Sequence, residues 1–297
     1  MTATKCGYVA ILGRPNVGKS TLLNRLLGQK VSITSKKPQT TRHHLLGIKT
    51  DAESQILYVD TPGIHVDEPR AINRYMNRSA RSVAGDVDLV VFVLDRSEWN
   101  ADDENVANLV ESVGTRSILV INKMDLFRNK RDLLPVIARA SERFPEAQIV
   151  PVSAETGENL DTLEGLVKDV LPAGPFYFPE DQITDRSERF MVSEILREKL
   201  MRQLGEEVPY SLTIQLDRFK LEKKTAHIDA TIFVERDGQK AILIGKGGER
   251  LKRIGADARK DIESLLGTRV MLTTWVKVKS GWSDDERALK SLGYDDV

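Results

Sequence analysis

Short apolar segments alternate with segments of helical hydrophobic spacing over residues 5–171. This alternation indicates a parallel sheet covered by helices on both faces. Residues 89–94 are all apolar, which is typical of a parallel strand buried on both sides. The expected strands are 8–12, 56–60, 89–95, 117–122 and 149–152, and the expected helices are 19–28, 70–84, 101–113, 131–143 and 159–170. We therefore predict an α/β domain with a mostly parallel sheet over residues 5–171.

Three prolines among the nine residues 171–179 interrupt this alternation. Neither a helix nor a central strand continues through them, so we expect a domain boundary there and a linker over 172–186. The elements expected beyond it are a helix over 187–204, an antiparallel pair of strands over 210–217 and 225–235, a short helix near 239, a longer helix ending near 266, and a strand over 269–278. This order predicts a separate α+β domain over 187–297, without an internal repeat.

The composition narrows the class of protein. The 297 residues are 40% hydrophobic and 30% charged, with 44 Lys and Arg against 44 Asp and Glu. These values exclude a disordered chain, a collagen-like chain and a small disulfide scaffold, and the length suits two domains. Cys6 is the single cysteine, which fits a reducing compartment. No apolar run approaches the roughly 18 residues that span a bilayer, so we expect a cytoplasmic protein.

A glycine-rich motif follows the first predicted strand. Residues 13–20, Gly-Arg-Pro-Asn-Val-Gly-Lys-Ser, match the pattern G-x-x-x-x-G-K-[ST] between a strand and a helix, which is the context that this phosphate loop needs. Its backbone N–H groups would surround phosphate oxygens at the positive end of the helix. Lys19 would reach the β- and γ-phosphates, and the Ser20 hydroxyl would take a Mg²⁺ position. The predicted phosphate-binding residues are Gly13, Arg14, Pro15, Asn16, Val17, Gly18, Lys19, Ser20 and Thr21.

A second motif distinguishes the purine. The tetrad Asn-Lys-Met-Asp ends at Asp125, after the fourth predicted strand. The Asp125 carboxylate can accept both the N1–H and the N2–H of guanine, whereas adenine leaves it desolvated and unpaired at a cost of a few kcal/mol. A helix cap is the structural alternative. Ser153 and Ala154 follow the next strand, where a backbone N–H would bond the guanine O6. The predicted base-binding residues are Asn122, Lys123, Asp125, Ser153 and Ala154.

A third motif would sense the last phosphate. Asp60, Thr61, Pro62 and Gly63 follow the second predicted strand. Asp60 would hold Mg²⁺ through water, and the Gly63 N–H would bond the γ-phosphate. Asp-x-x-Gly is also a common turn, but these motifs occur in the expected order, each at the end of a strand. Ile64, which follows Gly63, has no donor or acceptor in its side chain.

With these motifs, residues 8–171 resemble the translation-factor-related P-loop GTPases and, among them, the bacterial Era family. Residues 37–43, Lys-Pro-Gln-Thr-Thr-Arg-His, resemble the first switch of that family. The resemblance implies that Thr41, with Thr40 as the second choice, covers Mg²⁺ and the γ-phosphate. Signalling GTPases have a water-orienting glutamine after Asp-x-x-Gly, whereas this chain has Ile64, so hydrolysis needs another way to orient its water. We therefore expect slow intrinsic turnover, on the order of 10⁻⁴ s⁻¹ as in unassisted small GTPases.

The same resemblance implies the cofactors and the catalytic residues. In related GTPases with an apolar residue after Asp-x-x-Gly, a potassium ion held partly by the phosphate-loop asparagine supplies positive charge, and Asn16 matches that asparagine. The implied cofactors are GTP or GDP, Mg²⁺ and K⁺. The implied catalytic residues are Lys19, Thr41, Gly63 and Asn16, and the implied metal ligands are Ser20, Thr41 and Asp60.

The second domain contains a G-x-x-G turn, residues 245–248, between two predicted helices, as KH modules do. A helix-ending glycine turn is the alternative. Residues 240–260 contain seven Lys or Arg and two acidic residues, which favours phosphate contact. Ile242, Ile244 and Ile254 would line a groove for bases, although we expect core packing for at least two of them. The predicted RNA-binding residues are Ile244, Gly245, Lys246, Gly247, Gly248, Arg250, Lys252 and Arg253.

Basic and aromatic residues near the end, Trp275, Lys277, Lys279 and Trp282, would extend this surface, although a strand position favours the core for Trp275. The element order resembles the type II KH fold found in Era, so the resemblance covers nearly the whole chain. It implies a monomeric GTPase that binds 16S ribosomal RNA of the small subunit near its 3′ end and acts on the pre-30S particle during assembly. It also implies peripheral association with the inner face of the cell membrane.

Four other functions compete with this interpretation. A GTPase with two tandem domains would need a second phosphate loop, and a transfer-RNA-modifying GTPase would need a C-terminal cysteine; the sequence has neither. A non-catalytic RNA-binding scaffold stays open because Ile64 cannot orient water. A membrane-surface switch is disfavoured by the balanced charge and by the lack of a basic amphipathic terminus.

Overall fold

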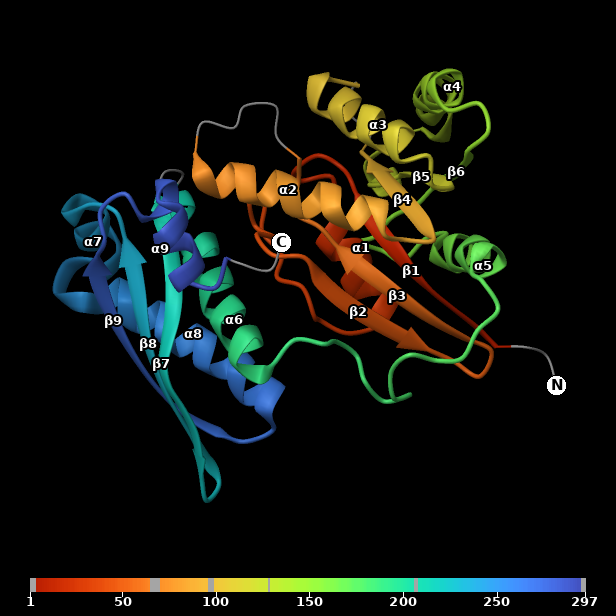
Figure 1. Ribbon diagram of the computed structural model, residues 1–297. Coiled ribbons are helices and arrows are strands. Elements are labelled where there is room, and N and C mark those ends of the chain that lie inside the picture. Colours follow the sequence, from red (N-terminus) through yellow and green to blue (C-terminus); the bar gives the residue numbers. More distant parts are fainter. Residues whose placement is uncertain (1–3, 65–69, 96–98, 128, 206–207, 295–297) are drawn as a thin grey trace.

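The first domain is built on a six-stranded sheet with the order β2-β3-β1-β4-β5-β6 (Figure 1). The computed structural model describes residues 4–64, 70–95, 99–127, 129–205 and 208–294. The strands are β1 (Lys5–Leu12), β2 (Leu45–Thr50), β3 (Ser54–Asp60), β4 (Leu89–Leu94), β5 (Ser117–Ile121) and β6 (Gln148–Pro151). Neighbouring strands are parallel except for β2, which runs antiparallel to β3 at the sheet edge.

Helices cover both faces of this sheet, as predicted. Val9 and Ile11 of β1 pack with helices α1 and α5, whereas Ala10 and Leu12 pack with α2, α3 and α4. Successive strand residues point to opposite faces, so an entirely apolar strand fills two cores at once. The helices are α1 (Lys19–Leu27), α2 (Ala71–Gly85), α3 (Ala101–Val113), α4 (Leu134–Arg143) and α5 (Leu160–Val170), with short 3₁₀ turns η1 (Met124–Leu126) and η2 (Lys130–Leu133).

Two details of this domain differ from the prediction. The edge strand β2 was not expected, because its antiparallel pairing with β3 interrupts the strand–helix alternation from which the sheet was inferred. The fourth helix begins at Leu134 rather than at residue 131. Pro135 stands in its first turn, where a missing N–H costs nothing, and the residues before it form η2.

The proline-rich linker lies against the first domain. Gln55 accepts hydrogen bonds from the backbone N–H groups of Tyr177 (2.8 Å) and Phe178 (3.0 Å) and donates to the Phe178 carbonyl (2.8 Å). Further along, Arg186 donates to the His44 carbonyl (2.7 Å). Irregular backbone needs such partners because it has no ladder of its own. The predicted linker range 172–186 stays a prediction, but these contacts fasten much of it to the first domain.

The second domain is a three-stranded sheet, β7-β8-β9, backed by helices on one face. Strand β7 is antiparallel and β9 parallel to β8. Its elements are α6 (Glu188–Gln203), η3 (Val208–Ser211), β7 (Leu212–Glu222), β8 (Thr225–Val234), α7 (Asp237–Ile244), η4 (Lys246–Gly248), α8 (Glu249–Leu266), β9 (Arg269–Val278), η5 (Trp282–Asp284) and α9 (Glu286–Ser291). The α+β prediction is therefore confirmed. None of the described helices combines the length and apolar character that crossing a membrane requires.

Helix α6 belongs to both cores. Its Met191 joins the core of the first domain, while Val192 and Leu196 join the core of the second. Figure 1 shows α6 between the two sheets. The second domain also reaches the first through Trp282, which packs with residues of α2.

The two tryptophans near the end were placed wrongly by the sequence. Trp275 is 46% exposed rather than buried, because Val270 and Val276 of β9 face the helices and Trp275 alternates to the opposite face. Trp282, expected on the RNA surface, is completely buried against α2. Helix α9 was not expected, and the last residues of the predicted second domain, 295–297, lie outside the described residues.

Candidate nucleotide and nucleic-acid sites

The phosphate loop connects β1 to α1 and has no room for larger side chains at its glycines. Gly18 has a φ of 101°, and a Cβ there would lie 2.3 Å from Asn122 Nδ2. A Cβ on Gly13 would lie 2.5 Å from the Val93 carbonyl oxygen. Gly63 of the third motif packs against the same loop, since a Cβ there would lie 2.8 Å from the backbone nitrogen of Pro15. Gly18, the N-cap residue of α1, has no side chain with which to cap the first turn, so the N–H groups there can face an anion.

Lys19 lies within this loop. Its Nζ donates to the carbonyls of Gly13 (2.8 Å) and Arg14 (3.0 Å), and the side chain is almost fully buried. Burial lowers the pKa of Lys19 to about 8, opposed by the nearby Asp60 carboxylate. A phosphate group would favour the charged amine, so the loop is suited to hold an anion at this end.

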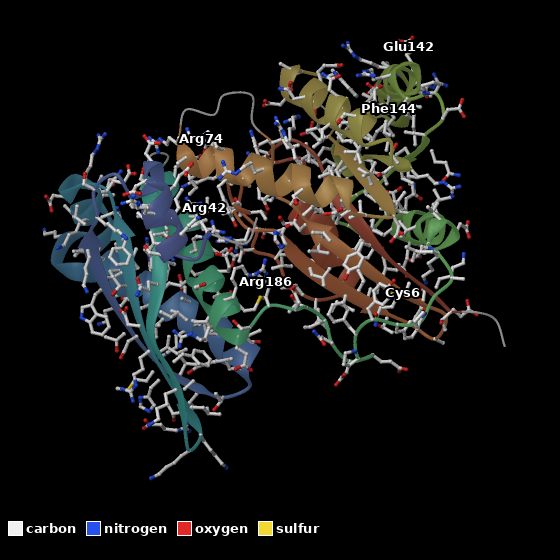
Figure 2. All side chains as sticks on the ribbon, viewed as in Figure 1. Cys6, Arg42, Arg74, Glu142, Phe144 and Arg186 are labelled. Carbon is white, nitrogen blue, oxygen red and sulfur yellow. The ribbon has the colours of Figure 1, made fainter. Side chains whose placement is uncertain are left out.

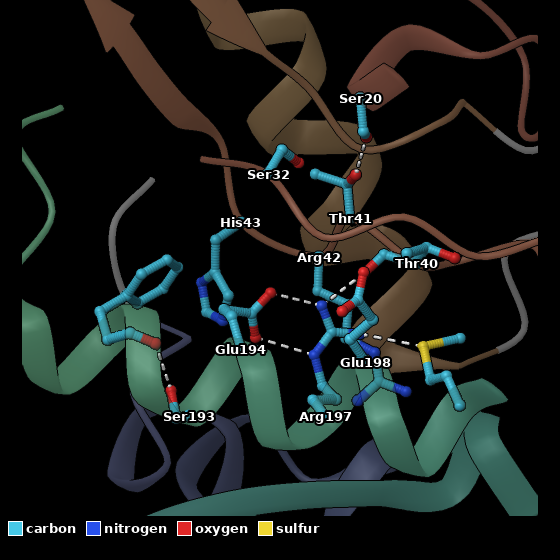
Figure 3. A network of polar contacts seen from close by, with 12 residues as sticks. Ser20, Ser32, Thr40, Thr41, Arg42, His43, Ser193, Glu194, Arg197 and Glu198 are labelled. Carbon is cyan, nitrogen blue, oxygen red and sulfur yellow. Dashed lines mark hydrogen bonds and ion pairs between the residues drawn. The ribbon is translucent and has the colours of Figure 1, made fainter. Parts of the chain in front are cut away.

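Three hydroxyl groups converge on Asp60 at the end of β3. Its Oδ2 accepts hydrogen bonds from Ser20 Oγ (2.7 Å), Ser32 Oγ (2.8 Å) and Thr41 Oγ1 (3.4 Å). Ser20 Oγ lies 2.9 Å from Thr41 Oγ1 (Figure 3). Asp60 is fully buried, and its Oδ1 has no hydrogen-bond partner among the described residues. Burial raises the pKa of Asp60, while Lys19 lowers it.

These oxygens suit a hard cation such as Mg²⁺, which takes oxygen ligands and keeps several of its waters. The unpartnered Asp60 Oδ1 is available to such a water. Among the described residues, no group of three or more His, Cys, Asp or Glu side chains could hold a metal ion. Hydroxyl and phosphate oxygens would therefore have to complete the coordination.

The two threonines of the first switch point in different directions. The first switch, residues 37–43, lies in the connection from α1 to β2. Thr40 Oγ1 donates to the Lys37 carbonyl (2.7 Å) within a turn, whereas Thr41 Oγ1 faces Ser20 and Asp60. The structure thus brings Thr41 to the predicted metal position. Ser32 was missed, because a serine in a polar connection has no distinguishing sequence signal.

The base-recognition motif joins three loops. Asn122 Nδ2 donates to the Val17 carbonyl (2.8 Å), and Asn122 Oδ1 accepts from the Ala154 N–H (3.0 Å). Lys123 Nζ donates to the Asn16 carbonyl (2.7 Å). The Ala154 N–H, one of the backbone donors in the segment expected to bond the guanine O6, is therefore already used to hold Asn122.

Asp125 lies in η1 and borders a cavity that extends from the base-recognition motif to the phosphate loop. Ser153 Oγ donates to Asp125 Oδ1 (2.6 Å), which fixes the orientation of the carboxylate. The cavity has a volume of about 470 Å³ and is bordered by the phosphate loop, the first switch, Gly63, Asp125 and Ala154. Leu126 borders it too and is 49% exposed, which gives a purine ring an apolar surface.

The other predicted residues of this site either anchor the loops around the cavity or border the cavity itself. Arg14 forms ion pairs with Asp95 (2.6 Å) and Asp103 (3.0 Å), so its side chain is engaged with carboxylates. Thr61 Oγ1 donates to the Ile11 carbonyl (2.8 Å) and ties the third motif to β1. Val17 and Pro62 are buried, and Pro15, Asn16 and Thr21 border the cavity.

The G-x-x-G turn of the second domain is open. Gly247 and Gly248 have φ values of 59° and 80°, and a Cβ on either would meet nothing within 4 Å. Arg250 Nη1 donates to the Ile242 carbonyl (2.6 Å) and braces the turn, while Lys246 and Lys252 are exposed. Arg253 donates to Gln203 Oε1 (3.0 Å) on α6.

A groove runs beside this turn between α8 and β9, with a volume of about 640 Å³. It is bordered by Gly248, Leu251, Lys252, Gly255, Ala256, Arg259, Val270, Met271, Leu272 and Thr274. The three isoleucines expected to line a groove do not border it: Ile254 is fully buried, Ile244 packs against the core, and Ile242 is 47% exposed. The spacing of Leu251, Gly255 and Arg259 by four residues is the signal that could have found this face of α8.

These two sites define a P-loop GTPase joined to a KH domain. The model of the 50S ribosome-binding GTPase family matches residues 8–123, and that of the KH domain matches residues 207–283. GTPase Era of Pseudomonas fluorescens (strain Pf-5) is 58% identical over 296 residues, covering 100% of this chain and 99% of the relative. GTPase Era of Pseudomonas aeruginosa (strain LESB58) is 56% identical over 294 residues, covering 99% and 96%.

Two solved structures match almost the whole chain. A tyrosine-to-alanine variant of Aquifex aeolicus Era bound to GDP·AlF₄⁻ superposes with a TM-score of 0.95 at 40% identity, covering 98% of this chain and 99% of the other. Era in complex with MgGDPNP and nucleotides 1506–1542 of 16S ribosomal RNA gives the same TM-score at 41% identity and the same coverage. The chain belongs to the GTPase Era family, and it is a GTP-hydrolysing enzyme that carries a KH domain.

Proposed function

We propose that this GTPase binds 16S ribosomal RNA near its 3′ end through the KH domain, acts in assembly of the small ribosomal subunit, and couples RNA affinity to the bound nucleotide. One observation carries the coupling: the first switch borders the nucleotide cavity and is also bonded to α6 of the second domain. A change of the switch between GTP and GDP therefore alters a contact between the two domains.

The nucleotide site supports binding of GTP with Mg²⁺. Backbone N–H groups and Lys19 surround the phosphates, while Asp125 recognises guanine. Ser20 and Thr41 would hold Mg²⁺ directly and Asp60 through water. When bound, Mg²⁺ neutralises charge on the β- and γ-phosphate oxygens. Hydrolysis is an in-line attack of water on the γ-phosphorus, in which Lys19 and the Gly63 N–H stabilise the charge on the phosphate oxygens.

The water must be oriented by a group other than Ile64. That side chain is buried among Ala10, Leu12 and the helices of one face of the sheet. Asn16 borders the cavity with a φ of 64°, and we retain the prediction that it helps to hold a potassium ion. Replacing potassium by sodium at constant ionic strength should then lower the rate of phosphate release.

The groove beside the G-x-x-G turn supports binding of unpaired RNA. Lys252 and Arg259 present positive charge at its border, and Lys246 is exposed in the adjacent turn. The small residues Gly255 and Ala256 give bases access to α8. The Era relative in complex with nucleotides 1506–1542 of 16S ribosomal RNA indicates which RNA to test first. The pre-30S particle as partner, a monomeric state, a cytoplasmic location and peripheral membrane association stay predictions.

Titration of a labelled RNA of that sequence with the full chain, in a non-hydrolysable GTP analogue and in GDP, tests the coupling. We expect the two dissociation constants to differ by at least about fivefold, which is the affinity ratio at the lower end of typical coupling free energies. Equal constants would mean two independent modules. No binding in either state would refute RNA recognition itself.

A further inference from the structure

The residues on both sides of Thr41 are held by the second domain. Before it, the Thr40 carbonyl accepts a hydrogen bond from Arg197 Nη2 of α6. After it, Arg42 is completely buried and donates from Nη1 to the Leu212 carbonyl (2.7 Å) and from Nη2 to the Tyr210 carbonyl (3.1 Å). Figure 3 shows Thr41 pointing toward Ser20, on the side of the switch that faces away from α6.

The environment of Arg42 is unusual for a switch residue. Its guanidinium carbon lies 6.0 Å from the centroid of the Trp282 ring, and Nη1 also donates to the Tyr294 hydroxyl (3.3 Å). Tyr294 in turn stacks on His43, with centroids 4.6 Å apart. Both Nη atoms of this buried guanidinium are matched by these partners, which fix the position of Arg42 closely. Figure 2 shows Arg42 between the two domains.

Arg197 is equally constrained. It is 3% exposed. Glu194, on the preceding turn of α6, accepts hydrogen bonds from its Nε (2.8 Å) and its Nη2 (2.5 Å). Burial disfavours the charged form, but the Glu194 carboxylate outweighs it and raises the pKa of Arg197. A guanidinium held this way donates to the Thr40 carbonyl with a fixed geometry.

We propose that Arg42 and Arg197 are positioning residues for GTP hydrolysis, and that the second domain thereby completes the catalytic site by holding Thr41 against Ser20 and the γ-phosphate. This inference rests on the role of Thr41 in the proposed function. Neither arginine borders the nucleotide cavity, so their effect is transmitted through the backbone of the switch. A small displacement of a catalytic group lowers the rate strongly without a matching change in binding.

The test is steady-state GTP hydrolysis by the full chain without RNA. Arg42→Lys and Arg197→Lys keep the charge but cannot reproduce the two-armed donor. We expect kcat to fall about tenfold in each, which is typical for loss of one hydrogen bond to a charged group. The dissociation constant for GDP should stay within twofold of wild type, and KM for GTP should change less than kcat.

Arg202→Lys is the matched control. Arg202 lies on the same helix and donates to Thr34 Oγ1 (2.9 Å) in the same connection between α1 and β2, but Thr34 precedes the first switch and does not adjoin Thr41. We expect kcat within twofold of wild type. An equal loss in this control would overturn the inference, because any contact between α6 and this connection would then matter alike.

Thr41→Ala separates the two proposals. If it lowers kcat while both arginine variants leave kcat unchanged, the inference fails and the proposed site stands. If Thr41→Ala itself leaves kcat unchanged, the role of Thr41 fails and the inference with it. A loss of GDP affinity as large as the loss of kcat would also overturn the inference, since the arginines would then maintain the pocket rather than position Thr41.

Discussion

The two glycine-rich turns of the chain differ in how closely the protein surrounds them. In the phosphate loop, a Cβ on Gly18 would overlap Asn122, and the neighbouring lysine is buried. In the G-x-x-G turn, a Cβ on Gly247 or Gly248 would meet open space, and Lys246 is exposed. The first turn is a preformed cradle for a compact anion, whereas the second leaves room for a long ligand to pass over it.

The sharpest break of this comparison is Gly18→Ala. The added methyl group would overlap Asn122 Nδ2 at 2.3 Å, and a φ of 101° is strained for alanine. We expect GTP affinity to fall at least 100-fold, about 2.8 kcal/mol, by calorimetry. Gly28→Ala is the control, because Gly28 also has a positive φ but nothing within 4 Å, and it should keep wild-type affinity. Wild-type binding by Gly18→Ala would show that the cradle is not rigid.

Asp125→Asn tests the base end of the same cradle. The amide can no longer accept both guanine N–H groups, so we expect GTP affinity to fall on the order of 100-fold. Xanthosine triphosphate, which offers a carbonyl where guanine has its amino group, should bind the variant better than GTP does. Competition against a fluorescent nucleotide measures both affinities. An unchanged preference for GTP would mean that Asp125 does not select the base.

Gly247→Asp tests the open turn. It adds a negative charge where RNA phosphates are expected, so RNA affinity should fall about tenfold while nucleotide affinity stays unchanged. Gly238→Asp adds the same charge at the opposite end of α7, at another exposed glycine with nothing within 4 Å, and should bind RNA nearly as wild type does. Equal losses in both variants would point to net charge rather than to the turn.

The smallest expected effect is a pH dependence of GTP affinity that arises from the phosphate loop. The pKa of Lys19 is lowered to about 8 in the free protein, and phosphate would raise it. The lysine contribution to GTP affinity is then fully present below pH 8 and is lost as the pH rises through the pKa of the complex. Calorimetry at about pH 8 in buffers of different ionisation enthalpy should detect proton uptake on GTP binding. No uptake would mean that Lys19 is already charged.

The nucleotide site was largely predictable because each motif follows a recognisable strand, and parallel strands bring their ends together at one edge. Ser32 escaped prediction because only the fold brings it to Asp60. The contact of Arg42 with Tyr294 joins residues 252 positions apart, and no local pattern encodes such a pair. The groove between α8 and β9 was missed because helical spacing on α8 becomes informative only when β9 is known to lie beside it.

The fastened linker limits how far the second domain can travel. Arg186 is hydrogen-bonded to the His44 carbonyl, and α6 begins at Glu188. Very little flexible chain therefore separates the last linker contact with the first domain from the start of α6. If the contacts of Arg42 and Arg197 between the first switch and the second domain break after hydrolysis, the linker still tethers the KH domain. Its local concentration near the switch then stays high, in the millimolar range for short tethers. The KH domain would then rotate about a short hinge and rebind the first switch in an intramolecular step, without a diffusional search.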